Sequence, residues 1–140
     1  KKNSNGGNLQ AEASFARKKL ISNWAKFNNI KTVLLAHTLD DQVETILMRF
    51  TRGSGVDGLV GMKKILNLNG ISWFRPLLKI RRGDLRNFLQ TKNIKWIEDP
   101  TNQKTNFMRN HVRNNVMPQV LKVNPGIRST IRKKLIETYL

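Results

Sequence analysis

The chain has 140 residues, which is enough for one domain with a hydrophobic core and too few for two. Its 26 Lys and Arg residues outnumber nine Asp and Glu residues, and the formal net charge of +17 indicates a polyanionic partner, with nucleic acid favoured over an anionic membrane surface. The lack of cysteine excludes disulfides and thiolate metal sites, and no apolar run approaches the roughly 20 residues of a membrane span. We expect a cytoplasmic protein that does not bind membranes.

The first half of the chain predicts a flexible lead-in, two helices and one strand. Residues 1–7 are polar, and residues 9–27 place apolar side chains at the three-and-four spacing of an amphipathic helix. Residues 30–36 form a short apolar run typical of a buried strand, and a second helix starts at Thr38. The apolar stripe of the first helix comprises Ala13, Ala16, Leu20, Trp24 and Phe27.

The second half predicts one more strand and three helical segments. Residues 71–74 are the strand, residues 82–92 are a helix, and an extended segment then enters a turn at Asp99-Pro100. A helical pattern continues up to Pro118, and a last helix lies near the end of the chain. The alternation of helices with a buried-looking strand predicts an α/β fold.

Residues 36–45, AHTLDDQVET, hold three of the nine acids in this strongly basic chain. They follow the predicted strand, at the edge where open α/β sheets bind ligands. A structural explanation accounts for part of the pattern, because Thr38 is a suitable N-cap and Asp41 stands in capping-box position. Acids near a helix N-terminus also gain ~0.3–1 kcal/mol from the helix dipole.

Glu44 is the residue that helix capping leaves unexplained. Asp40 and Glu44 are four residues apart, so they would place two like charges on the solvent side of one helix, and neither has a base at its own i+4 position. We interpret this unpaired acidic face as a site for a positively charged ligand, either an ammonium group or a metal ion. Asp40, Asp41 and His37 are the candidate metal donors, although their spacing matches no defined metal motif.

The glycines that follow the second helix imitate a nucleotide motif. Gly53, Gly55 and Gly58 satisfy G-x-G-x-x-G, but the dinucleotide fingerprint must follow a strand, whereas this stretch follows a helix. Gly53 is better explained as a helix stop, and Arg52 beside it could meet a phosphate. No Walker-type sequence occurs in the chain.

Six short motifs in one order carry a family resemblance: AHTLDDQVET, RGSG, LVGM, RPLL, DPTN and FMRNHVR. Together they resemble the bacterial tRNA(Ile)-lysidine synthetases, which are N-type ATP pyrophosphatases with a Rossmann-like PP-loop catalytic domain. The resemblance implies an enzyme that uses ATP and Mg²⁺ to adenylate C2 of the wobble cytidine in tRNA(Ile) with a CAU anticodon. Free L-lysine then displaces AMP and forms lysidine.

The resemblance gives the acidic helix a catalytic role. Asp41 and Glu44 match positions whose carboxylates hold the lysine substrate near magnesium-bound ATP. Asp40 lies nearby and is the weaker candidate for a metal contact, and His37 borders the same pocket. Lysine would bring the positive charge that the acidic face lacks, and its amino group must be positioned and deprotonated.

Four residues are the expected nucleotide contacts: Arg17, His37, Arg52 and Gly53. Arg17, on the first helix, is similar to a family arginine that meets ATP, and an ordinary solvated base is the alternative explanation. Thr38 stands where the family often has a second histidine, and Ser14 stands where the first helix often carries an arginine.

Arg109 and Arg113 are four residues apart and are expected to share one helical face. Two guanidinium groups there would stabilise the pyrophosphate leaving group or bind tRNA phosphates; a solvated basic face is the alternative. Asn102, in the DPTN turn, is a further tRNA contact or simply a helix cap. His111 is expected to be structural, and Trp24 and Trp73 to be core residues.

The sequence contains no S-G-G-x-D-S loop, on which the family's ATP site rests. We therefore expect residues 8–122 to be part of a catalytic domain that lacks central strands, and residues 123–140 to be a helix leading toward absent C-terminal domains. A second copy, in a homodimer, is one way to complete the sheet. We also expect that the chain alone does not turn over ATP.

Two other functions remain open at this point. A different PP-loop enzyme, for example one that thiolates tRNA, would share the motifs, but thiolating relatives usually carry cysteines. A non-catalytic RNA-binding protein would explain the charge, and it would leave the paired carboxylates unexplained.

Overall fold

The computed structural model describes residues 6–54, 60–100 and 108–139, and these fall into two compact units. Of the described residues, the first unit combines those up to 35 with 64–76, and the second combines those between 36 and 63 with those from 77 to 139. Helices and a mixed sheet are both present, which confirms the predicted α/β class. In the described part of the chain, no helix is long and apolar enough to cross a membrane.

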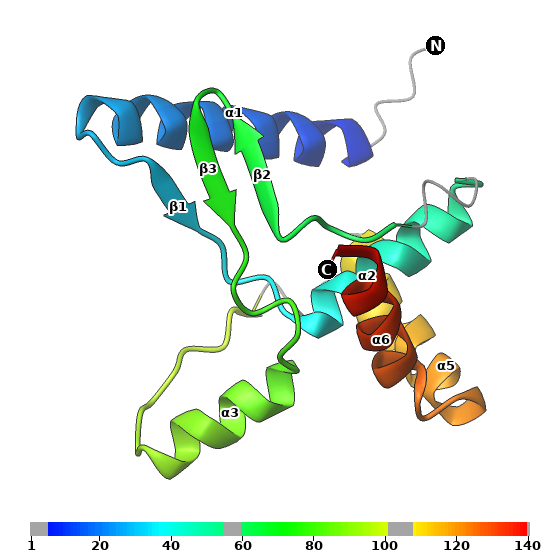
Figure 1. Ribbon diagram of the computed structural model, residues 1–140. Coiled ribbons are helices and arrows are strands. Elements are labelled where there is room, and N and C mark those ends of the chain that lie inside the picture. The colour runs from blue at the N-terminus through cyan, green and yellow to red at the C-terminus, as the bar shows by residue number, and fades with distance from the viewer. Residues whose placement is uncertain (1–5, 55–59, 101–107, 140) are drawn as a thin grey trace. The chain divides into compact units, whose positions relative to one another are not determined.

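The first unit is a helix beside a three-stranded sheet. It contains α1 (Gly6–Phe27), β1 (Thr32–Leu34), β2 (Ile65–Leu68) and β3 (Ile71–Phe74). Figure 1 shows β3 between the other two strands; β1 runs parallel to it and β2 antiparallel. The α1 helix begins inside the stretch expected to be a lead-in.

Strand β2 was not predicted, although the sequence carries a signal for it. Asn69 and Gly70 join β2 to β3, and both have positive φ, 52° and 71°. An Asn-Gly pair with this geometry is the preferred connection of a two-residue hairpin. The preceding residues, Ile65–Leu68, alternate between exposed and half-buried positions, as expected for a strand with one face packed.

The core of the first unit confirms one tryptophan prediction and corrects the other. Trp73 on β3 is 1% exposed and packs with Ala25 and Ile71, as expected for a core residue. Trp24, however, is 60% exposed, and Leu20 on the same predicted stripe is also exposed. The helix contacts the sheet through the neighbouring face, where the small Ala25 allows close approach.

Strand β1 also differs from its prediction. It covers three residues of the predicted 30–36, and both Thr32 and Leu34 are exposed, so it is not the buried strand that the apolar run indicates. Among the described residues β1 pairs with β3 alone. One side of the strand is therefore an unpaired edge in the described structure.

The second unit is helical. It contains α2 (Leu39–Thr51), α3 (Arg82–Thr91), α4 (Met108–His111), a π-helical segment (Val112–Val116), α5 (Met117–Val123) and α6 (Ile127–Tyr139). Its core is formed by Val43 of α2 with Val112 and Met117, and Ile131 of α6 packs against them. This core places α2 beside the helices that follow residue 107.

The predicted helix up to Pro118 continues beyond that proline. Pro118 lies in the first turn of α5, and α5 continues to Val123. Proline is tolerated in a first turn because the N–H group that it lacks would have no partner within the helix there. The preceding five residues are π-helical, a geometry that is rare and often found at functional sites.

Candidate functional site: an arginine-clamped carboxylate cluster

Helix α2 starts with a buried capping arrangement. The backbone N–H of Thr38 and its Oγ1 hydroxyl both donate to Oδ2 of Asp41, at 2.8 and 2.7 Å, which confirms that Asp41 caps the helix start. Burial works to raise the pKa of the Asp41 carboxyl, but the hydrogen bonds from Thr38 and the charges of Arg82 and Arg109 outweigh it. The pKa of Asp41 therefore lies below its usual value.

Glu44, one turn further along α2, is the centre of the cluster. Its side chain is only 2% exposed, so it does not lie on the solvent side of the helix as expected from the sequence. Arg113 binds it with a two-pronged contact, Nε to Oε1 at 2.7 Å and Nη2 to Oε2 at 2.9 Å. Arg82 and Arg109 approach the same carboxylate more loosely, at 3.5 and 3.8 Å. A bidentate arginine is the strongest partner available to a buried carboxylate.

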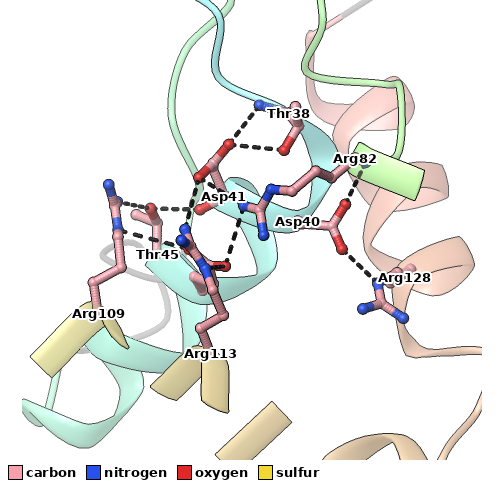
Figure 2. Close-up of polar contacts among 9 residues, drawn as sticks. Thr38, Asp40, Asp41, Thr45, Arg82, Arg109, Arg113 and Arg128 are labelled. Carbon is pink, nitrogen blue, oxygen red and sulfur yellow. Dashed lines mark hydrogen bonds and ion pairs between the residues drawn. The ribbon is translucent and has the colours of Figure 1, made fainter. Parts of the chain in front are cut away.

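Asp40 links α2 to two other helices (Figure 2). Its Oδ2 accepts a hydrogen bond from the backbone N–H of Arg82 at 2.8 Å, and its Oδ1 accepts one from Nε of Arg128 at 2.9 Å. Arg82 also reaches Oδ1 of Asp41 at 3.3 Å. The starts of α3 and α6 are thus both attached to the start of α2.

All three carboxylates have arginine partners, so the unpaired acidic face inferred from the sequence is wrong. The physical reason is that the partners lie 38 to 88 positions away along the chain, where spacing within one helix cannot reveal them. Arg113 benefits in turn, because its hydrogen bond to Glu44 raises the pKa of its guanidinium further above the ordinary value.

Arg109 and Arg113 face α2 together, as their spacing predicts (Figure 2). The two are held differently. Arg113 makes the two short contacts with Glu44, whereas Nη2 of Arg109 donates to Oγ1 of Thr45 at 3.1 Å. The Nε atom of Arg109 is buried and has no hydrogen-bond partner among the described residues. Arg109 therefore has unused hydrogen-bonding capacity at Nε, whereas Nε of Arg113 is bound to Glu44.

Three residues of this cluster were not identified from the sequence: Thr45, Arg82 and Arg128. Thr45 belongs to the acidic motif, but the partner of its hydroxyl, Arg109, lies on α4, which is distant in sequence. Arg82 starts the predicted helix at 82–92, and a position at a helix start gives no indication of which carboxylate its N–H will meet. Arg128 stands 88 positions from Asp40.

Residues 1–120 match the family model of the PP-loop domain. The chain belongs to the PP-loop family. It is 47% identical over 108 residues to the tRNA(Ile)-lysidine synthase of Wolbachia pipientis wMel. The aligned segment covers 77% of this chain and 25% of that protein. Proteins of the same name from Ruegeria pomeroyi and Legionella pneumophila strain Lens are 48% identical over 103 residues and 38% over 126. The chain spans 25 to 29% of the length of these relatives.

Two of the other residues expected to contact nucleotide in this PP-loop domain, Arg52 and Gly53, do not join the cluster. Arg52 and Gly53 end α2, and the φ of 72° at Gly53 confirms the helix stop. They lie at the opposite end of a helix of 13 residues, roughly 12 to 18 Å along its axis from the three acids at 1.5 Å per residue. Arg17 is exposed on α1, which belongs to the first unit.

The structure describes only some of the remaining residues that the sequence singled out. His37 is half-buried and immediately precedes the cap residue Thr38. His111 is exposed, and its Nδ1 lies 2.9 Å from the side-chain amide of Asn115, which is a structural contact. Asn102 lies outside the described residues, as do Gly55 and Gly58. Their roles stay predictions.

A resident metal ion does not fit the cluster of this PP-loop chain. Magnesium takes oxygen ligands in octahedral geometry, but both oxygens of Asp40 accept N–H donors. Among the described residues no group of three His, Cys, Asp or Glu side chains is arranged to hold a metal. Arginines surround the carboxylates instead, and their guanidinium groups would bind a phosphate more readily than a cation.

Proposed function

We propose that the chain is part of an enzyme that forms lysidine in tRNA(Ile) with a CAU anticodon. In this reaction ATP adenylates the oxygen at C2 of the wobble cytidine and releases pyrophosphate. An amino group of free L-lysine then attacks C2, and AMP leaves with the C2 oxygen. The observation that carries the proposal is the carboxylate–arginine cluster on the most acidic stretch of this PP-loop domain. The names of the similar proteins, tRNA(Ile)-lysidine synthase, support it.

The arginines supply the electrostatic part of this chemistry. Arg109 is the better candidate for contact with pyrophosphate or tRNA phosphate, because its nearest carboxylate oxygen is 3.8 Å away and its Nε has no hydrogen-bond partner among the described residues. Arg113 is held by two short contacts to Glu44 and would orient that carboxylate. We assign Arg109 to the phosphate and Arg113 chiefly to positioning.

The carboxylates would hold lysine by exchanging partners. Asp41 and Glu44 are already neutralised by arginines, so an ammonium group can enter only if a guanidinium leaves. Arg82 and Arg109, with contacts of 3.3 to 3.8 Å, are held most loosely. When phosphate attracts these arginines, the ammonium of lysine would take their place, with Asp40 and His37 beside it. Charge balance in the cluster is thereby kept throughout.

ATP enters this proposal as a substrate, with Mg²⁺ bound to its phosphates. Because the cluster does not fit a resident metal, the ion would be held by the phosphates and by water rather than by Asp40. Arg17, Arg52 and Gly53 are proposed nucleotide contacts, and Asn102 is a proposed tRNA contact. The setting would be the cytoplasm, where tRNA, ATP and free lysine occur together.

A chimera tests the proposal directly. The matched segment of the Wolbachia pipientis wMel relative is replaced by this chain, and transfer of labelled lysine to tRNA(Ile) is measured with and without ATP. We expect ATP-dependent labelling that is lost in Glu44→Gln and kept in Glu98→Gln, whose carboxylate pairs with Arg86 at an exposed site. A folded chimera that binds tRNA but transfers no lysine would favour the non-catalytic RNA-binding alternative.

A further inference from the structure

A pocket opens beside the carboxylate cluster, between α3 and α6. It has a volume of about 340 Å³ and is lined by Asp40, Arg81, Gly83, Asp84, Asn87 and Arg128. Only Asp40 and Arg128 also belong to the cluster around α2. Arg81, Gly83, Asp84 and Asn87 are exposed, so the pocket is accessible from the surface.

The charges that line the pocket balance, with two arginines against two carboxylates, and Arg132 nearby adds one positive charge. Both carboxylates are paired within the protein. Arg128 neutralises Asp40, which also accepts a hydrogen bond from the backbone N–H of Arg82, and Arg81 binds Asp84 with a two-pronged contact at 3.0 Å. The guanidinium of Arg82 is directed to Asp41 and Glu44 and does not line the pocket. Arg132 lies close enough to Asp84 to contribute to the lowering of its pKa, after the larger effect of Arg81.

The arginines can offer donors to an incoming anion. Arg128 binds Asp40 through Nε, and its terminal nitrogens point away from that carboxylate in Figure 2. Arg81 is 61% exposed and its partner Asp84 is 47% exposed, so this pair is easily rearranged. Asn87 adds a side-chain amide to the same lining. Two guanidinium groups and an amide are the donor set that phosphate oxygens prefer.

We propose that this pocket binds a phosphate of the RNA backbone. The inference rests on the proposed function to the extent that the RNA is a tRNA substrate. RNA is favoured over a small anion because the pocket lies at the surface and the whole chain carries a net charge of +17. Gly83 leaves room for a polymer, since a Cβ built there would meet nothing within 4 Å.

Two substitutions and a matched control test the site. Arg81→Gln removes a donor from the pocket, and Gly83→Gln fills it without changing the charge. Arg86→Gln makes the same charge change on the same helix, outside the pocket; Arg86 is 47% exposed and pairs with the exposed Glu98, as Arg81 pairs with Asp84. The affinity of the purified protein for a tRNA(Ile) transcript and for an unrelated tRNA is measured over a range of salt concentrations.

We expect Arg81→Gln to weaken RNA binding roughly threefold and to lower the salt slope by about one, the value for one lost phosphate contact. Gly83→Gln should weaken binding to a similar degree, and Arg86→Gln should leave the slope unchanged. Equal effects of Arg81→Gln and Arg86→Gln, with none for Gly83→Gln, would overturn the pocket and leave the proposed function intact. The expected pattern with no preference for tRNA(Ile) would support the pocket and count against the proposed substrate.

Discussion

Arg113 grips the Glu44 carboxylate at both oxygens, with Nε 2.7 Å from Oε1 and Nη2 2.9 Å from Oε2. Glu44 lies in the middle of α2 and Arg113 in the π-helical segment, so this contact fastens together two elements that are distant in sequence. Because the Glu44 side chain is 2% exposed, the carboxylate depends on its arginine partners for the hydrogen bonds that water would otherwise supply.

The first prediction concerns the stability that this contact provides. Glu44→Ala leaves Arg113 half-buried without its main partner, and we expect the free energy of unfolding to fall by about 3 kcal/mol. Glu98→Ala, which breaks the exposed pair with Arg86, should cost less than about 1 kcal/mol. Urea unfolding followed by circular dichroism distinguishes the two. Equal small effects would show that Glu44 is not held as tightly as its contacts indicate.

The second prediction concerns the pH dependence of stability. The pKa of Asp41 is lower in the folded protein than its ordinary value of 3.8, so the folded state binds this proton less readily than the unfolded state does. The stabilisation by Asp41 is therefore complete well above pH 3.8 and is lost as the pH falls through the lowered pKa. The difference in unfolding free energy between the wild type and Asp41→Asn should shrink below about pH 4.

Thr38→Val provides the control for that titration. The substitution keeps the side-chain shape and removes the Oγ1 hydroxyl, which donates to Asp41 at 2.7 Å. The pKa of Asp41, followed by carboxyl NMR, should rise toward its ordinary value, because one of the hydrogen bonds that lowers it is gone. An unchanged pKa would mean that the arginine charges dominate.

The third prediction compares two glycines. A Cβ on Gly61 would lie 2.4 Å from Oε1 of Gln42, whose fully buried side chain makes hydrogen bonds to both the N–H and the carbonyl of Met62. Gly61→Ala should therefore destabilise the protein by about 1–3 kcal/mol through the loss of these bonds. Gly83→Ala meets nothing and lies within α3, so it should stabilise by up to about 1 kcal/mol. Thermal melts of both variants provide the measurement.

The sequence predicts the local features of the site well. The capping of α2 by Thr38 and Asp41 and the shared face of Arg109 and Arg113 follow from spacing, because each depends on residues within one helix. The pairing of Glu44 with Arg113 does not follow from spacing, since it is made across the core of the second unit. Periodicity considers only the charges on one helix. It therefore predicts that Glu44 is unpaired, although Arg113 binds it from another element.

The same limit applies to the first unit. An apolar stripe on α1 is visible in the sequence, but the face that meets β3 carries Ala25 and Ile21, one position round the helix. Which face packs is decided by how closely helix and sheet can approach, and hydrophobicity alone does not contain that information. The assignment to the PP-loop family, in contrast, depends on motif order and not on burial.

The fourth prediction tests the two tryptophan positions. Trp73→Ala should destabilise the first unit by about 3–5 kcal/mol, because it empties a fully buried site, whereas Trp24→Ala should change stability by less than about 1 kcal/mol. Iodide should quench the fluorescence of Trp24 strongly and that of Trp73 weakly. The contribution of each tryptophan is obtained by comparing the quenching of each single variant with that of the wild type. Strong protection of Trp24 would mean that a partner covers α1 in solution.

The fifth prediction concerns ATP. The sequence has no S-G-G-x-D-S loop to cradle pyrophosphate, and the carboxylates of Asp40, Asp41 and Glu44 are paired with arginines. We therefore expect the purified 140-residue chain to release no pyrophosphate from ATP, even with tRNA(Ile) and lysine present. The chimera with the Wolbachia pipientis wMel relative is the positive control, because the replaced segment would then act with the rest of that protein. Pyrophosphate release by the chain alone, dependent on tRNA and abolished by Arg109→Gln, would contradict the prediction and place a complete nucleotide site within these residues.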